Sequence, residues 1–343
     1  MISKQRVYAA ISHKPCDKPP RFIWFSTPTK TMIKEQLGLS ENKFLHDFGN
    51  DILSTWVSIN GEMERDIEPG KTHTDDWGIT WKKEGYYNMV IDHPLKGKSL
   101  EQIKNYILPD PFSESRYSEL ERLIQNYGDE YFIGADVSGT IFEPAYHLRH
   151  MEELMMDLVQ NKNEANVLLD KITDFSVKVA IESIKRGVDW VWLGDDMGAQ
   201  YGMMISPDMW RKYFKPRMKN AIDLIRDYKK DTIIAYHSCG SMYPIVGDLV
   251  ELGIDVLNPI QESASNMDQK EFKAEFGDEI TLMCGPDTQM FLATASEQEV
   301  YDKTCEKIVQ LGKNGGYIFA VSHTLQPDVP LENICAMIKA LND

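Results

Sequence analysis

The chain has 343 residues, and its 37 Lys and Arg against 53 Asp and Glu give a formal net charge of −16. A composition of 42% hydrophobic and 26% charged residues is typical of a globular protein with a large core. The acidic balance argues against nucleic acid as a partner, because binding phosphates needs a basic surface.

The chain shows no sign of a membrane or secretory protein. Its apolar stretches are only a few residues long, whereas a bilayer span needs ~20. The opening MISKQRVYAAISHKP lacks the apolar region of a signal peptide. Five cysteines are an odd number in a chain of this size, which favours a reducing compartment over a disulfide framework. We therefore expect a cytoplasmic protein without a membrane partner.

Short apolar runs rich in Ile, Val and aromatic residues alternate with amphipathic segments. Such runs are typical of strands that are buried on both faces, and the segment 164–186 has the helical period of about 3.6 residues. Eight strands alternating with helices predict an α/β fold of the (β/α)8 TIM-barrel type, with a doubly wound open sheet as the competing architecture. The runs cover residues 21–26, 51–57, 131–139, 189–196, 231–240, 256–261, 280–287 and 317–323.

The gap between the second and third strands, at about 58–130, is too long for one helix. Within it, HTDDWGITWKKEGYYNMVIDHP predicts a β-hairpin or a small meander, with turn signals at residues 76–78 and 82–85. We interpret this segment as an insertion into a single TIM-barrel domain that covers residues 1–343.

Residues with metal-binding chemistry gather at the predicted strand ends, where such barrels carry their active sites. In His237-Ser238-Cys239-Gly240 the alternation of a strand lets His237 and Cys239 face the barrel mouth together. Imidazole nitrogen and thiolate are typical zinc ligands. Cys284 and His323 at other strand ends add candidates, and they favour a metal site over the alternative of a core histidine and cysteine.

Carboxylates occupy other strand ends. Asp195 and Asp196 are adjacent, so one should face the site and the other should brace a loop. The first role fits a proton donor to a leaving group and the second a helix cap. The same two interpretations apply to Asp136.

A further group of residues is predicted to contact a substrate or cofactor. Gln261 ends the sixth strand, and Asp287 with Gln289 follows the seventh, where polar ligands are often held. Trp24 in the first strand completes this group. No glycine-rich dinucleotide or NTP motif follows a strand.

The order of these motifs is similar to that in a known family. It begins with MISKQRVYAAISHKPCDKPP and continues through GDD at 194–196, ISPDMWRKYFKP at 205–216, HSCG at 237–240, DVLNPIQ at 255–261, CGPDTQ at 284–289 and GGYIFAVSHTLQPDVPLENI at 315–334. Over nearly its whole length the chain resembles the uroporphyrinogen decarboxylase superfamily, which also contains zinc- and corrinoid-dependent methyltransferases. The resemblance implies the eight-stranded barrel.

The site residues distinguish two branches of this superfamily. The tetrapyrrole decarboxylases carry an arginine-rich segment of the form R-Q-A-G-R shortly after the first strand, whereas the matching FSTPTK at residues 25–30 has no arginine. Because arginine supplies charge-assisted bonds to a highly anionic substrate, we do not expect decarboxylation of uroporphyrinogen.

The methyltransferase branch carries H-x-C and a distant cysteine near the last strand as zinc ligands. His237 and Cys239 match the first two, but the third position falls on His323. The resemblance therefore implies a ligand set of His237, Cys239 and His323, with Cys284 as the alternative third ligand.

The resemblance implies methyl transfer between a small methylated substrate, a methyl ether in the first place, and the corrinoid (cobalamin) of a separate carrier protein. Zinc would act as a Lewis acid, and Asp195 or Asp196 would protonate the leaving oxygen. Two alternatives stand beside it: a decarboxylase or lyase that acts on another substrate with His323 as general acid, and a non-catalytic barrel that binds a corrinoid or its carrier.

Overall fold

The computed structural model describes residues 1–63, 65, 67–85 and 87–343. Its main sheet has eight strands in the order β1-β13-β12-β11-β10-β7-β6-β2, and every ladder in it is parallel. All eight predicted runs form strands. The strands are β1 (Arg21–Phe22), β2 (Ile52–Trp56), β6 (Phe132–Asp136), β7 (Trp190–Gly194), β10 (Ile233–His237), β11 (Val256–Asn258), β12 (Thr281–Cys284) and β13 (Tyr317–Ala320).

The first and last strands of this order, β1 and β2, lie side by side and close the sheet. The Asp51 amide donates to the Arg21 carbonyl at 2.9 Å. One residue earlier, the side chain of Asn50 accepts from the Ile23 amide at 2.8 Å and donates to the Ile23 carbonyl at 2.9 Å. The sheet is therefore a nearly closed (β/α)8 barrel, as predicted, and not an open doubly wound sheet.

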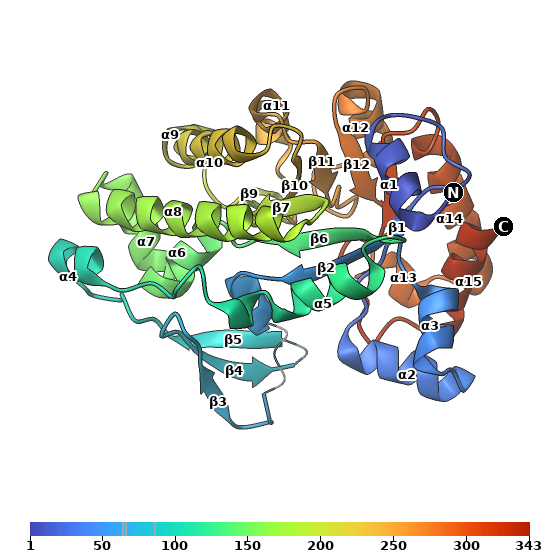
Figure 1. Cartoon of the computed structure of the whole chain (residues 1–343), viewed down its shortest axis with the longest axis horizontal. Coiled ribbons are helices and arrows are strands. Elements are labelled where there is room, and N and C mark those ends of the chain that lie inside the picture. Colours follow the sequence, from blue (N-terminus) through green and yellow to red (C-terminus); the bar gives the residue numbers. More distant parts are fainter. Residues whose placement is uncertain (64, 66, 86) are drawn as a thin grey trace.

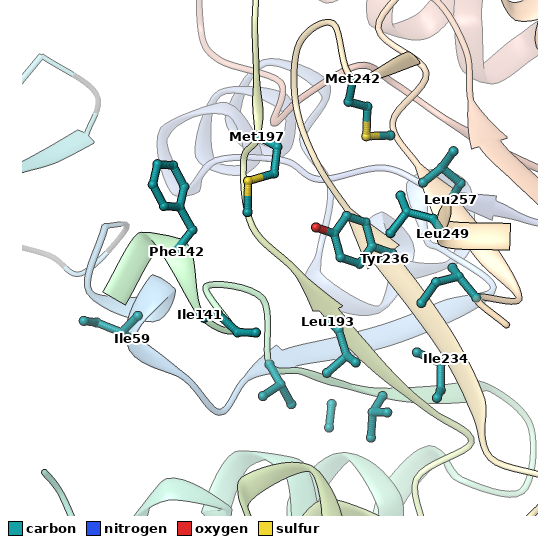
Figure 2. Packing of buried hydrophobic residues seen from close by; sticks show 14 of the residues in the cluster. Ile59, Ile141, Phe142, Leu193, Met197, Ile234, Tyr236, Met242, Leu249 and Leu257 are labelled. Atoms are coloured by element: carbon teal, nitrogen blue, oxygen red, sulfur yellow. The ribbon is translucent and has the colours of Figure 1, made fainter. Parts of the chain in front are cut away.

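Side chains from the strands fill the barrel interior. Phe132, Trp190, Trp192 and Met283 belong to one buried cluster, which the first helix closes with Val7 and Ala10. Alternate strand residues point outward instead, where they pack against the ring of helices. Figure 2 shows part of this outer layer, with Leu193 of β7 and Tyr236 of β10 among the buried side chains.

The helices surround the strands (Figure 1). The longest, α8 (Asn163–Arg186), confirms the predicted amphipathic segment. The others of the ring and its loops are α1 (Ser3–Ile11), α2 (Thr27–Leu37), α3 (Glu41–Phe48), α5 (Ser118–Tyr127), α6 (Phe142–Arg149), α7 (Met151–Val159), α9 (Pro207–Tyr213), α10 (Lys215–Tyr228), α11 (Tyr243–Leu252), α12 (Gln269–Phe276), α13 (Phe291–Thr294), α14 (Glu297–Leu311) and α15 (Leu331–Asn342). None of the helices in the described ranges has the length and apolar character needed to cross a bilayer.

The segment between β2 and β6 holds a second, antiparallel sheet, in agreement with the predicted meander; its residue 86 lies outside the described residues. The order along this segment is η1 (Ile59–Met63), β3 (Thr72–Thr74), β4 (Thr80–Glu84), β5 (Tyr87–Asp92), α4 (Leu100–Asn105) and η2 (Glu114–Arg116), before the barrel helix α5. Figure 1 shows the three strands to one side of the barrel. Buried Trp81 anchors β4, because its indole nitrogen donates to Asp75 at 2.7 Å and its ring packs on His147 of α6.

Candidate functional site

A small cavity of about 60 Å³ lies at the carboxyl ends of the strands. In this fold the loops that follow the strands meet at that face. The side chains around the cavity come from the ends of β2 and β10, from the loops that follow β1, β6, β7 and β13, from the first turn of α6 and from the insertion. They are Trp24, Trp56, Met63, Tyr87, Ser138, Glu143, Asp196, His237, His323 and Thr324.

His237 is the last residue of β10 and faces this cavity. Its Nε2 lies 3.4 Å from Cys239 Sγ and 3.5 Å from Asp196 Oδ1. Its other ring nitrogen, Nδ1, lies 2.8 Å from Oδ1 of Asn258. The indole of Trp24 packs edge-on against the imidazole, with ring centres 5.9 Å apart. The ring is therefore held on two sides, and its Nε2 edge points at a thiol and a carboxylate.

Cys239 lies two residues beyond the end of β10, in a loop and not on the strand itself. Its backbone amide donates to Asp196 Oδ1 at 2.7 Å, which fixes the loop against the end of β7. Burial and the nearby Asp196 carboxylate raise the pKa of the Cys239 thiol well above its usual value. The thiol is therefore neutral at pH 7 until a cation comes close to it.

The two adjacent aspartates are separated by the structure. Asp195 is fully buried and accepts from the amides of Ile141 and Glu143 at 2.9–3.0 Å, so it caps the start of α6. Burial raises the pKa of Asp195 to about 7. Asp196 instead lines the cavity. Asp196, His237 and Cys239 each offer one ligand atom, and these atoms all lie within 4.8 Å of one another.

The profile of the uroporphyrinogen decarboxylase family (URO-D) matches residues 80–343, well over half of the chain. The chain belongs to the uroporphyrinogen decarboxylase family. Decarboxylases of Legionella pneumophila and Pelodictyon phaeoclathratiforme are 23% and 22% identical to it over 196 and 182 residues, which is 57% and 52% of this chain. These matches cover 52% and 49% of the two relatives, so the chain spans about half the length of the curated relatives it matches.

Solved structures support the fold of this family. A methyltransferase from Methanosarcina mazei superposes with a TM-score of 0.76 at 17% identity, over 100% of this chain and 98% of the other. An endo-1,4-beta-mannanase from Rhizomucor miehei superposes with a TM-score of 0.51 at 8% identity, over 95% and 94% of the two chains. At these identities the likeness establishes the barrel alone.

The cavity differs from what an anionic tetrapyrrole needs. No lysine or arginine is among the residues that line it within the described part of the chain. The loop after β1, where the decarboxylases of the family carry arginines, begins α2 with Ser26 as its cap. Lysine and arginine are the side chains that give charge-assisted bonds to carboxylates, and the described lining residues supply neither.

His323 follows β13 and lines the cavity, as its place at a strand end predicts. Its Nδ1 lies 3.2 Å from the hydroxyl of Tyr87, which also accepts from Gln326 at 2.9 Å. Burial and the neighbouring His237 lower the pKa of His323, so it is neutral at pH 7. It stands beside the group of Asp196, His237 and Cys239 without belonging to it.

Cys284 does not lie at the site, which corrects the expectation that it is an alternative ligand. It ends β12, but its neighbour Met283 takes the inward position, so the Cys284 side chain points out toward the helices. Burial there raises the pKa of its thiol to about 12. The alternation of the strand, which predicted the direction of His237, puts this thiol on the wrong face.

The remaining predicted residues build the walls and loops around the cavity. Trp24 lines it, stacked between Trp56 and Trp192 at ring separations of 6.0 and 5.0 Å. Asp136 is buried behind it and accepts from the Ser138 hydroxyl at 2.6 Å.

Three predicted contacts lie away from the cavity. Gln261 accepts from the Gly240 amide at 2.9 Å, and Asp287 accepts from the Met290 amide at 2.7 Å and the Ser263 hydroxyl at 2.8 Å, so both hold loops together. Gln289 is exposed to solvent.

Three residues near the ligand atoms were not predicted. Glu143 lies in the first turn of α6, and Tyr87 comes from the insertion; both line the cavity. No local pattern in the sequence distinguishes them from surface residues. Asn258 had a signal: it ends the strand next to β10, at the register position opposite His237.

Proposed function

We propose that this barrel is a zinc-dependent methyltransferase, which moves a methyl group between a small methylated substrate, a methyl ether in the first place, and the corrinoid of a separate carrier protein. The observation that carries the proposal is the convergence of Asp196, His237 and Cys239 inside the barrel mouth. Membership of a family with decarboxylases and the fold shared with a methyltransferase of Methanosarcina mazei support it.

The donor set fits zinc. Nitrogen, sulfur and oxygen donors together are typical of Zn²⁺, and the thiolate disfavours magnesium and calcium. We assign the three ligand positions to His237, Cys239 and Asp196. Three protein ligands leave one position open, as catalytic zinc sites do. Compared with the sequence-based expectation, Asp196 takes the ligand place of His323.

His323 then takes the role of the proton-holding group. It lies near His237 and Asp196 and is neutral at pH 7, so its imidazole can donate a hydrogen bond to a leaving oxygen. Zinc in the site would supply Lewis-acid polarisation of the atom that bears the methyl group. The indoles of Trp24 and Trp56 form an apolar side of the cavity.

The size of the cavity favours a small substrate. Pockets for drug-sized ligands span roughly 300–1,000 Å³, whereas this cavity measures about 60 Å³. A methyl-bearing group fits inside it, while a macrocycle has to approach from the mouth. Because the macrocycle stays outside the cavity, this arrangement supports a methyl acceptor, the corrinoid, that is carried by another protein.

The test is the zinc content of the purified protein. We expect about one zinc per chain, a strong loss in Cys239→Ala, and no loss in the matched control Cys284→Ala, because Cys284 faces the helices. Asp196→Asn should lose more zinc than His323→Asn.

Equal zinc in wild type and Cys239→Ala would disprove the metal assignment. A wild-type protein without zinc would favour a decarboxylase or lyase that uses His323 as general acid.

A further inference from the structure

Three neighbouring strands form a chain of hydrogen bonds behind the candidate ligand His237. Asn258 ends β11, is 1% exposed, and pairs in register with His237 of β10. On its other side lies β12, where its amide nitrogen Nδ2 donates to the Met283 carbonyl at 2.9 Å. Asn258 does not line the cavity, so it acts on the site only through His237.

The bond to Met283 determines which way the Asn258 amide faces. A backbone carbonyl oxygen can only accept, so the NH₂ group has to point at β12 and the side-chain oxygen at β10. That oxygen lies 2.8 Å from His237 Nδ1. Because an amide oxygen also only accepts, the proton of this bond resides on Nδ1 of His237.

A neutral imidazole carries one N–H, so a proton on Nδ1 leaves a lone pair on Nε2. The Nε2 atom is the one that lies 3.4 Å from Cys239 Sγ and 3.5 Å from Asp196 Oδ1. Trp24 and Trp192 pack edge-on against the ring at 5.9 and 6.2 Å and hold its plane. Tautomer and direction of the ring are thus set before any ion arrives.

We propose that Asn258 is a positioning residue that holds His237 as the Nδ1–H tautomer and thereby presents Nε2 to the metal. The inference rests on the proposed function only where it concerns the metal; the tautomer is a property of the metal-free protein. Partners that orient a ligating histidine typically change metal affinity 10–100-fold when they are removed.

The first experiment needs no metal. Long-range ¹H–¹⁵N correlation spectra of the metal-free protein, recorded at alkaline pH with the His237 signal identified by its loss in His237→Gln, report which ring nitrogen is protonated. We expect the Nδ1–H pattern in wild type and a gain of the Nε2–H pattern in Asn258→Leu, which keeps the volume but removes the acceptor. An Nε2–H pattern in wild type, or an unchanged pattern in the variant, would overturn the proposal.

The second experiment measures zinc affinity by competition with a chelator. Asn258→Leu should bind zinc 10–100-fold more weakly, and Asn258→Asp, whose carboxylate still accepts from Nδ1, should recover most of the affinity. The matched control is Asn333→Leu, because buried Asn333 also donates to backbone carbonyls, at Leu292 and Ala295, whereas the bond to His237 belongs to Asn258.

The outcomes separate the two proposals. A wild-type protein that binds no zinc contradicts the proposed function and leaves the tautomer test standing. Equal affinity in wild type and Asn258→Leu contradicts the role of Asn258 alone, and so does an Asn333→Leu variant that loses as much affinity as Asn258→Leu.

Discussion

Asp195 and Asp196 follow one another at the end of β7, yet they belong to different parts of the molecule. Asp195 turns away from the mouth and receives two amides at the start of α6, whereas Asp196 turns toward His237 and Cys239. The two side chains continue the alternation of β7 just beyond its last residue, Gly194, which accounts for their opposite directions. Because the two residues are adjacent in the sequence, the same substitution at each position can be compared directly.

We expect opposite consequences from the two amide variants. Asp195→Asn should lower the free energy of unfolding by about 1–2 kcal/mol, because one of the two carboxylate oxygens that accept from the start of α6 becomes an NH₂ group, which can only donate. It should leave zinc content unchanged. Asp196→Asn should reduce zinc content and activity with nearly unchanged stability. Denaturant unfolding and elemental analysis of both variants check this. An Asp196→Asn variant that binds zinc and turns over like wild type would contradict the ligand role of Asp196, and an Asp195→Asn variant as stable as wild type would contradict the capping role of Asp195.

At the scale of elements, α6 joins the insertion to the barrel. Its His147 is buried beneath Trp81 of β4, with ring centres 5.1 Å apart, and its backbone oxygen bonds to His93 after β5 at 2.7 Å. The Leu95 amide donates to the Leu148 carbonyl at 2.9 Å beside it. Asp195 caps the start of the same helix, and the first turn of the helix presents Glu143 to the cavity, so one short helix links the inserted sheet to the site.

The buried histidine of α6 makes stability depend on pH. Burial lowers the pKa of His147 from 6.5 to about 3. Between these two values the unfolded chain binds the proton and the folded chain does not, so this contribution to stability is complete above pH 6.5 and is lost as the pH falls toward 3. The loss has an upper bound of about 5 kcal/mol.

The measurement is the difference in unfolding free energy between wild type and His147→Phe from pH 7.5 to 4.5. We expect wild type to lose stability relative to His147→Phe as the pH falls, because only wild type carries the titrating His147. His46→Gln is the control, since the His46 side chain is 85% exposed. A difference that stays constant over this range would contradict a buried neutral His147.

The strands and the inserted meander were predictable because both signals are local. Continuous apolar runs identify strands buried on two faces, and Gly78 and Gly85 mark the turns of the meander. The observed strands are shorter than predicted. Residues such as Cys239 and Asp287 directly follow the apolar runs and were counted with them, but in the structure they belong to loops.

The site was predictable in part. His237 and one member of the pair Asp195 and Asp196 could be placed because strand ends share one face of a barrel. Which of the two carboxylates faces the mouth could not be told from the sequence. The direction of Cys284 depended on knowing that Met283 points inward, which the apolar run does not reveal. Tyr87 reaches His323 from 236 positions away in the sequence, so only the tertiary arrangement brings the two together.

The whole molecule combines a net charge of −16 with a mouth that holds a carboxylate beside a thiol. Such a surface repels phosphate-rich ligands. Asp196 and His237 line a cavity too small for a macrocycle, so the proposed methyl transfer to a corrinoid needs in-line placement of the reacting atoms at the mouth, in a complex with the carrier.

We therefore expect no methyl transfer from the barrel alone. Turnover should begin when a reduced corrinoid protein or free cob(I)alamin is supplied with the right substrate, and the absorbance of methylcobalamin measures it. Cys239→Ala should stay inactive under the same conditions, and Cys284→Ala should remain active. Silence with a cognate corrinoid protein across methoxylated aromatics, methyl thiols and methylamines would favour the decarboxylase or the non-catalytic interpretation.

The junction between β1 and β2 links the closure of the barrel to the wall of the candidate site. Among the described residues, it is the one junction between neighbouring barrel strands that lacks a strand ladder, and the amide of Asn50 clasps Ile23 in its place. The next residue is Trp24, the wall of the cavity. These two bonds therefore help to hold Trp24 in place at the one junction without a ladder, whereas ladders join the strands at the seven other junctions. The barrel is thus closed at one junction by side-chain hydrogen bonds in place of a ladder, and that closure lies one residue from the wall of the candidate site.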